Sequence, residues 1–284
     1  ALAAVGFVIF RVIRPFLRGN ANQQRVQDDR RTNDPVSPGD TAALTEIHLR
    51  LGNPSAATPD AKNTVNLLLV NQAFALSYNR DRGAPNWVSW RVTPADLGEL
   101  RRSDDFRPDN RLPNGWPQTL PTDYIRSGYT RGHMCPAGDR SADRASNSAT
   151  FLMTNIVPQT DDSNQGVWQS MEVYSRMLVR RGATVYIIAG AYGEKGRIRN
   201  RVTIPTNIWK VVVVVPRGEE ITDRLSPNTR VIAINTPNID GVHDDDWRKY
   251  ATTVRAIEQA TGLDLLSRIT REDQDRVETK VGTF

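Results

Sequence analysis

The chain has 284 residues, with 37 Lys plus Arg against 32 Asp plus Glu, so its formal net charge is +5. With 38% hydrophobic and 24% charged residues, its composition is that of a folded globular protein, and a small positive charge permits a nucleic-acid partner without requiring one. One cysteine, Cys135, excludes a disulfide framework and a cysteine-rich zinc module, and the lack of long apolar runs excludes a polytopic membrane protein.

The N-terminal segment 1–18 is hydrophobic and contains three arginines after its apolar start. We expect the remnant of a signal peptide or membrane anchor there, although signal peptides carry their charges before the apolar run. The alternative is a short interfacial or core helix. Residues 19–44 are polar, contain two prolines and predict a linker. This organisation favours a secreted, periplasmic or membrane-anchored protein.

A folded domain is predicted over residues 45–284. Segments 66–76 and 87–92, separated by the turn-like residues 79–85, indicate two paired strands. The five valines of 211–215 predict a strand that is buried on both faces, because β-branched residues favour strands. Further apolar runs of strand length cover 151–153, 185–189, 208–215 and 230–235.

Two helices are predicted as well. One covers 163–181 and ends at Gly182, and the other covers 246–260, opened by the acidic run 244–246 and closed before Gly262. Strands and helices do not alternate regularly, so the pattern predicts an α+β fold around a central, largely antiparallel sheet flanked by helices.

Several enzyme classes lack their usual signatures in this sequence. It contains no phosphate-binding P-loop, no glycine-rich dinucleotide motif, no G-x-S-x-G elbow and no H-E-x-x-H. What remains is a dense polar region between residues 102 and 176. Within it, four residues spaced by four would drift by only about 40° per step on an α-helix and share one face. They are Asn164, Trp168, Glu172 and Arg176.

These residue types suit phosphodiester hydrolysis. A neutral imidazole such as that of His133 can take a proton from water at physiological pH. The side-chain oxygen of Asn164 is a hard ligand suited to magnesium, and Glu172 on the same face can hold the waters of the ion. Arginines provide forked donors to phosphate oxygens.

Four separated segments, in order, closely resemble the DNA/RNA non-specific endonucleases. These are the ββα-metal nucleases, which include mitochondrial endonuclease G and the secreted bacterial sugar-non-specific nucleases, and the likeness is greatest to the bacterial branch. The resemblance extends from about residue 45 to the C-terminus. It rests on RSDDFRPD (102–109), RGH (131–133) with GDR (138–140), MTNIVPQ (153–159) and NQGVWQSME (164–172).

The resemblance implies a role for each matching residue at the centre of the site. His133 matches the general base that activates the attacking water. Asn164 matches the direct protein ligand of Mg²⁺, for which Mn²⁺ is expected to substitute, and Glu172 matches the carboxylate that holds the ion through water.

Three arginines match phosphate-binding positions of the family. Arg102 corresponds to an arginine that stabilises the pentacovalent phosphate, Arg176 to one near the scissile or adjacent phosphate, and Arg131 to one that shapes the site. The implied reaction cleaves DNA and RNA, through contacts to the phosphate backbone, to 5′-phosphate and 3′-hydroxyl ends. The family also includes homodimers, and both a homodimer and an inhibitor protein are open expectations for this chain.

One position departs from the family pattern, because Thr130 stands where the signature Asp-Arg-Gly-His has its aspartate. We expect reduced activity or a shifted metal and pH preference. The alternative is a catalytically impaired, nuclease-like domain that binds nucleic acid or protein, and a third reading is a phosphodiesterase for small or lipid substrates.

Some residues of this region also have ordinary structural readings. Glu172 and Arg176 alone would be a solvent-exposed ion pair, and Trp168 is expected to pack in the core. His243, beside the acidic run 244–246, is expected to mark a helix N-terminus rather than a second metal site.

Overall fold

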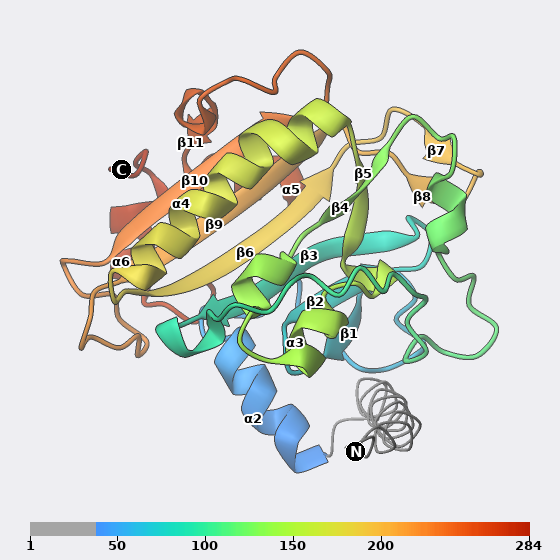
Figure 1. The fold of residues 1–284 in the computed structure, drawn as a ribbon. Helices are drawn as coiled ribbons and strands as arrows, with labels where there is room; N and C mark the ends of the chain where they lie inside the picture. Colours follow the sequence, from blue (N-terminus) through green and yellow to red (C-terminus); the bar gives the residue numbers. More distant parts are fainter. Residues whose placement is uncertain (1–37) are drawn as a thin grey trace, which may run out of the picture. The chain divides into compact units, whose positions relative to one another are not determined.

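A seven-stranded sheet runs through the computed structural model, which describes residues 38–284 (Figure 1). The strand order is β1-β2-β3-β6-β9-β10-β11, and every neighbouring pair is antiparallel. The predicted α+β fold around a largely antiparallel sheet is therefore confirmed. The strands are β1 (Leu67–Val70), β2 (Ala75–Asn79), β3 (Ala84–Val92), β6 (Thr184–Tyr192), β9 (Asn207–Val215), β10 (Arg230–Pro237) and β11 (Ala251–Thr252).

Both faces of the sheet are covered, as the valines of β9 show. Val212 and Val214 belong to one hydrophobic cluster, which also contains residues of helix α4 (Gln169–Arg180). The other three valines point to the opposite cluster, which contains residues of α5 (Val254–Thr261). The prediction that residues 211–215 are buried on both faces is confirmed. In Figure 1, α4 lies across the face formed by β6, β9 and β10.

A second, smaller sheet stands beside α4. Strands β4 (Thr130–His133) and β5 (Ile156–Gln159) form an antiparallel ribbon. The chain then enters a π-helix, η5 (Ser163–Trp168), which continues directly into α4. The predicted helix 163–181 therefore exists, but its first six residues have wider turns. This ββα unit carries most of the polar residues singled out above.

Three predicted elements differ from the structure. The predicted strand 66–76 is a hairpin of β1 and β2, because Asn71 Oδ1 accepts hydrogen bonds from the backbone of the turn. The predicted strand 151–153 is a single bridge between Arg107 and Leu152, followed by the short helix η4 (Met153–Asn155).

The predicted helix 246–260 is wrong over its first half. Asp246 caps a short 3₁₀ helix, η6 (Trp247–Tyr250), which is followed by β11. Helix α5 begins only at Val254, where the hydroxyl of Thr253 accepts a hydrogen bond from the backbone of Ala256. A local hydroxyl cap therefore replaces the expected acidic one.

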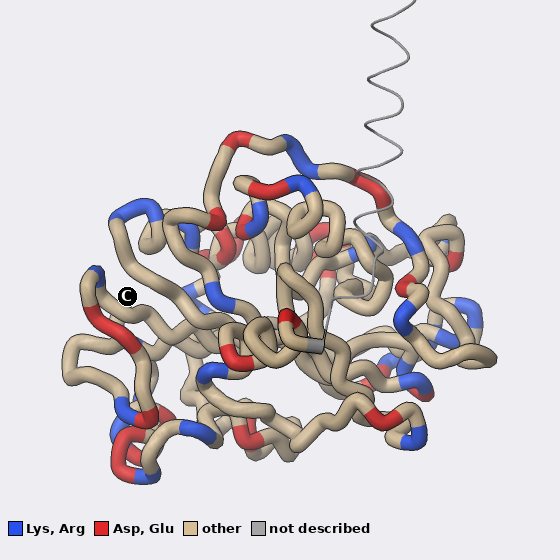
Figure 2. The backbone as a smooth tube through the Cα atoms, turned by 90° about the horizontal axis from the view of Figure 1, so that it is seen from below, with Lys and Arg blue, Asp and Glu red and all other residues tan. Residues whose placement is uncertain are grey.

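The remaining elements are α2 (Pro38–His48), η1 (Pro94–Asp96), η2 (Pro121–Tyr124), η3 (Ala137–Arg140), α3 (Arg144–Ala149), β7 (Arg197–Ile198), β8 (Val202–Thr203) and α6 (Arg271–Glu278). Helix α2 begins inside the segment 19–44 that was expected to be a linker. The expected signal or anchor segment 1–18 lies outside the described residues. Within residues 38–284, no helix is long and apolar enough to cross a membrane. Figure 2 shows basic and acidic residues mixed along the loops around the sheet.

Candidate active site

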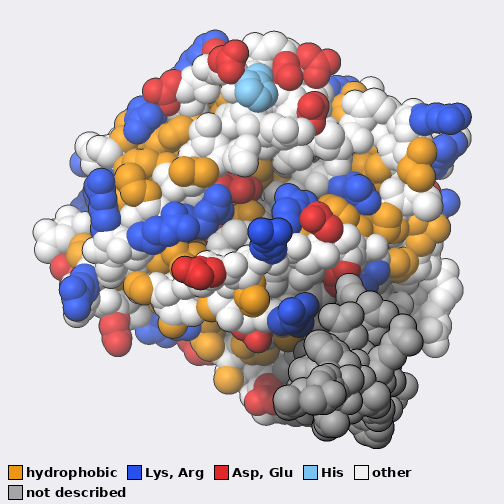
Figure 3. Space-filling view, viewed as in Figure 1, with side chains coloured by type: hydrophobic (Ala, Val, Ile, Leu, Met, Phe, Trp, Pro, Cys, Tyr) orange, Lys and Arg blue, Asp and Glu red, His pale blue; other side chains and the backbone are white. Residues whose placement is uncertain are grey.

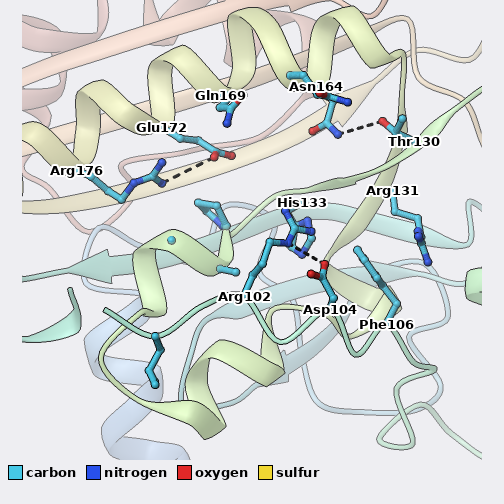
Figure 4. Close-up of a pocket in the computed structure, with 15 residues that line it drawn as sticks. Arg102, Asp104, Phe106, Thr130, Arg131, His133, Asn164, Gln169, Glu172 and Arg176 are labelled. Atoms are coloured by element: carbon cyan, nitrogen blue, oxygen red, sulfur yellow. Dashed lines mark hydrogen bonds and ion pairs between the residues drawn. The ribbon is translucent and has the colours of Figure 1, made fainter. Parts of the chain in front are cut away.

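All six site residues predicted from the sequence line one open cavity of about 640 Å³ (Figure 4). They come from three places: the segment before η2, the strand β4, and the η5–α4 helix. Thr130, Phe106 and Gln169 line the same cavity. The predicted residues are Arg102, Arg131, His133, Asn164, Glu172 and Arg176.

The β4–β5 ribbon places the histidine. Gly132 faces the side chain of Gln159 so closely that a Cβ at this position would lie 2.2 Å from Gln159 Cδ, so no other residue fits without displacing its neighbour. The next residue, His133, accepts a hydrogen bond at its backbone oxygen from Trp168 Nε1 at 3.0 Å. Trp168 is only 1% exposed, which confirms its predicted place in the core. The indole thus ties the ribbon to the helix.

The imidazole of His133 is enclosed by aromatic rings. Its centroid lies 5.3 Å from that of Phe106 and 4.9 Å from that of Phe151. Burial, together with the charges of Arg102 and Arg131, lowers the pKa of His133 to about 3. Nε2 is buried and has no hydrogen-bond partner in the described chain. The ring is therefore neutral at physiological pH.

Asn164 faces the same cavity from the π-helix. Its Nδ2 donates to Oγ1 of Thr130 at 3.1 Å, which leaves the amide oxygen to other partners. The wide turn passes close to a neighbouring loop: a Cβ on Gly166 would lie 2.3 Å from the backbone oxygen of His243. Within residues 38–284, no group of three or more His, Cys, Asp or Glu side chains could hold a metal ion. An ion at Asn164 would accordingly keep most of its waters, as Mg²⁺ commonly does.

Glu172 sits between two cations. Its carboxylate oxygens lie 4.0 Å from Lys210 Nζ and 3.8 Å from Arg176 Nη1. The side chain of Glu172 is 11% exposed and that of Arg176 is 13% exposed, so the pair is not the solvated surface contact of the ordinary reading. Burial raises the pKa of Glu172 to about 7, against the lowering effect of Lys210 and Arg176. The buried position thus favours the protonated form of the Glu172 carboxyl relative to a carboxyl in water.

The three arginines differ in how firmly neighbouring residues hold their side chains. Arg176 is fixed, since Nη1 lies 2.9 Å from Oδ1 of Asp139, whose other oxygen accepts from Trp90 Nε1 at 2.9 Å. Arg102 is 58% exposed and pairs with Asp104 at 2.8 Å. Arg131 is exposed as well and lies over the ring of Phe106, 4.1 Å from its centroid. One guanidinium is thus held in the wall and two reach the opening. Figure 3 shows basic side chains crossing this face of the molecule.

Two buried residues that contact the site residues, Lys210 and Phe151, were not identified from the sequence. Lys210 is 1% exposed and lies 4.0 Å from the centroid of the Trp168 ring. A lysine directly before the valine run 211–215, which was predicted to be buried on both faces, was an available signal for Lys210, because a buried charge requires partners. Phe151 carried no such signal, since its contact with His133 depends on tertiary structure.

Two other residues remain outside the site. His243 is exposed, hydrogen-bonded to Asp244 at 2.8 Å, and does not line the cavity. Cys135 is fully buried, and burial raises the pKa of its thiol, so it is not a nucleophile.

The antiparallel ribbon, the helix that follows it and the cavity of His, Asn, Glu and Arg side chains define a nuclease of the ββα-metal type. The family model for DNA/RNA non-specific endonucleases matches residues 53–272, and the chain belongs to this family. It is accordingly an endonuclease, of a metal-dependent kind.

Its relatives agree with this assignment. A nuclease of Nostoc sp. (strain PCC 7120) is 44% identical over 236 residues, which span 83% of this chain and 86% of that protein. The human mitochondrial nuclease EXOG is 28% identical over 204 residues, 66% of this chain and 54% of its own length. The crystal structure of the EndoG/EndoGI complex contains a chain of the same fold, with a TM-score of 0.66 and 24% identity over 81% of this chain and 94% of that one.

Proposed function

We propose that this protein hydrolyses phosphodiester bonds of DNA and RNA without sequence preference, leaving 5′-phosphate and 3′-hydroxyl ends, with magnesium or manganese as its ion. One observation carries the proposal. A single open cavity brings together a neutral imidazole, an amide oxygen, a carboxylate and three guanidinium groups. Each of these groups has a distinct part in phosphodiester hydrolysis.

His133 is the general base in this proposal. Its lowered pKa keeps the ring nitrogens free of a second proton across the physiological range. A water placed between the imidazole and the phosphorus would lose its proton to the ring as it attacks. The aromatic surroundings exclude other waters from the buried edge of the ring.

Asn164 would hold the ion directly through its side-chain oxygen, and Glu172 would hold it through water. When bound, the ion supplies charge stabilisation at the leaving oxygen. The donor set fits magnesium because it offers hard oxygens and no sulfur or imidazole cluster. Thr130 supports this arrangement by accepting the amide hydrogen of Asn164, which fixes the orientation of the amide.

The arginines bind the phosphate backbone. Arg176 is held by Asp139 and presents its charge from a fixed position, whereas Arg102 and Arg131 reach the open side. Their donors contact phosphate oxygens, which are the same in every nucleotide, so little base preference is expected. The same chemistry applies to DNA and RNA.

Partners and location extend the proposal. The open cavity is accessible to an inhibitor protein, and the solved structure of similar fold, the EndoG/EndoGI complex, concerns the inhibition of EndoG. Relatives include mitochondrial nucleases, whereas the hydrophobic segment 1–18 supports export or membrane anchoring.

Cleavage of supercoiled plasmid and of a structured RNA by the full chain tests the proposal, with Mg²⁺, with Mn²⁺ and with EDTA. We expect metal-dependent nicking that is lost with EDTA and in His133→Ala, while His243→Ala, which changes an exposed histidine outside the cavity, retains it. Binding of plasmid by the folded wild type without cleavage under either metal would contradict the proposal and favour a binding domain. Cleavage of small diesters alone would favour the phosphodiesterase.

A further inference from the structure

Three rings meet at the centre of the site. The centroids of Phe106 and Phe151 lie 4.9 Å apart at an interplanar angle of 85°, and His133 contacts Phe151 in the same edge-on manner. An arginine lies against each phenylalanine: Arg131 over Phe106 at 4.1 Å and Arg102 over Phe151 at 5.4 Å. Figure 4 shows Arg102 and Phe106 on either side of His133, with Arg131 beyond Phe106.

A short backbone contact holds the two phenylalanines together. The backbone nitrogen of Arg107 donates to the oxygen of Phe151 at 3.3 Å, and Met153 donates back to Arg107 at 2.9 Å. Each phenylalanine immediately precedes one partner of this Arg107–Leu152 bridge. The bridge therefore brings the two rings side by side, although they are 45 positions apart in the sequence.

No polar group orients the imidazole within residues 38–284. No carboxylate lies within ion-pair or hydrogen-bond distance of His133 in the described chain, and Nε2 is buried without a partner. A catalytic histidine is commonly oriented by a hydrogen bond to one ring nitrogen. Edge-to-face contacts between rings also have preferred geometry and contribute about 0.5–1.5 kcal/mol each. The contacts that the described chain makes with the imidazole are those with the rings of Phe106 and Phe151.

We propose that Phe106 and Phe151 are positioning residues that orient the His133 imidazole and hold Arg131 and Arg102 on either side of it. The inference rests on the proposed function for its catalytic consequence, but the ring contacts exist independently of activity. Phe106 is the better test position, because it is half-buried in the cavity wall whereas Phe151 is buried in the core.

The first experiment observes the ring directly. In the full chain labelled at histidine, NMR resolves three imidazoles, and the signal lost in His133→Ala identifies that of His133. We expect Phe106→Leu to shift this signal, because the ring current of Phe106 is removed, and Phe106→Tyr to preserve it. The signals of His48 and His243 serve as internal references. An unmoved His133 signal in Phe106→Leu would overturn the proposal.

The second experiment measures plasmid or duplex cleavage. We expect Phe106→Leu to lower kcat at least about tenfold, and Phe106→Tyr to restore kcat to within about threefold. The matched control is Phe284→Leu, since Phe284 also packs edge-on against an aromatic, Trp247, and lies near an arginine, Arg248. Unchanged kcat in Phe106→Leu would overturn the inference, whereas an inactive wild type would overturn the proposed function and leave the NMR result to decide on the ring contacts.

Discussion

Asn164 donates a hydrogen bond from Nδ2 to Oγ1 of Thr130 at 3.1 Å, and the hydroxyl of Thr130 donates in turn to the backbone oxygen of Gln159 at 3.2 Å. These two hydrogen bonds connect the proposed metal ligand to the β4–β5 ribbon, and none of the three groups that form them is charged. In the family pattern that the sequence resembles, an aspartate occupies the position of Thr130. The Thr130 hydroxyl accepts from Asn164 as a carboxylate could, but it also donates to Gln159, which an ionised aspartate could not do, and it carries no negative charge.

Thr130→Asp is expected to raise the cleavage rate, because a carboxylate accepts the amide hydrogen of Asn164 more strongly and adds negative charge near the ion. Rates in Mg²⁺ and Mn²⁺ over a range of pH provide the measurement. Thr130→Asn is the matched control, since it is similar in size to Asp and uncharged. Equal rates for both variants and the wild type would remove the basis of this prediction.

Asn164→Ala is expected to weaken Mn²⁺ binding at least about tenfold, because the substitution removes the oxygen that we propose as the direct ligand. Titration calorimetry of the protein with Mn²⁺ alone measures this without substrate. Ser170→Ala, an exposed change on α4 outside the cavity, serves as the control and should bind as the wild type does. Identical Mn²⁺ affinity in Asn164→Ala would place the ion elsewhere.

Glu172→Gln is expected to abolish most activity and to change the pH dependence of stability. The pKa of Glu172 is about 7 in the folded protein, above its ordinary value of 4.5. The folded state therefore binds more protons between these values, and the contribution of Glu172 to stability falls as pH rises from about 4.5 to 7. Relative to Glu172→Gln, the wild type should lose up to about 1.4 kcal/mol per pH unit in this window.

Denaturant unfolding in EDTA at several pH values measures the effect of Glu172→Gln. The control is Glu272→Gln, which removes a carboxylate that is 77% exposed and remote from the cavity. A constant stability difference between the wild type and Glu172→Gln across pH 4.5–7 would show that this carboxylate is not destabilised by burial.

His48 should make the fold sensitive to acid. It is 3% exposed, both ring nitrogens lack hydrogen-bond partners within the described chain, and burial lowers its pKa to about 3 from 6.5. The unfolded state binds more protons between these values, so the stabilising contribution is complete above pH 6.5 and falls by up to about 1.4 kcal/mol per unit as pH decreases toward 3.

His48→Leu removes this titration, and its stability relative to the wild type should improve as pH falls below 6.5. Thermal unfolding between pH 7 and pH 4.5 measures the trend. His243→Ala should show the opposite direction, because Asp244 raises the pKa of His243 and that contribution is present at low pH. A parallel pH profile for His48→Leu and the wild type would contradict the prediction.

The polar residues of the site could be predicted from the sequence, but the buried residues and the local backbone geometry that hold them in place could not. Residue type and spacing brought Asn164, Glu172 and Arg176 to one helix, and the structure places all three on the cavity. The assumption of a regular α-helix was wrong over 163–168, which form the π-helix η5, whereas the core position predicted for Trp168 is confirmed. A π-helical turn, with i→i+5 hydrogen bonds, is rare and occurs mostly as a single turn inside an α-helix, so the local sequence does not predict it.

Contacts across long sequence separations were the other limit. Lys210 meets Glu172 only because β9 passes under α4, and Phe151 meets Phe106 only through the Arg107–Leu152 bridge. The predicted strand through residue 71 and the predicted helix start at residue 246 were also wrong, because local side-chain hydrogen bonds form a turn at 71 and cap a separate short helix at 246. Residue type and spacing thus predicted which side chains form the site, whereas the contacts that position these side chains depend on tertiary packing.

The sheet separates the layer that contains the cavity from a layer on its other face, and the two differ in whether an attached molecule would obstruct the cavity. Every residue of the cavity lies on or beside the α4 layer, whereas the loop 216–229 contributes Ile221 and Leu225 to the opposite hydrophobic cluster and does not line the cavity. A carrier, a bead or a second protein joined to the exposed part of that loop would leave the other side open to a long polymer. The fold thus provides a natural point of attachment for an immobilised enzyme.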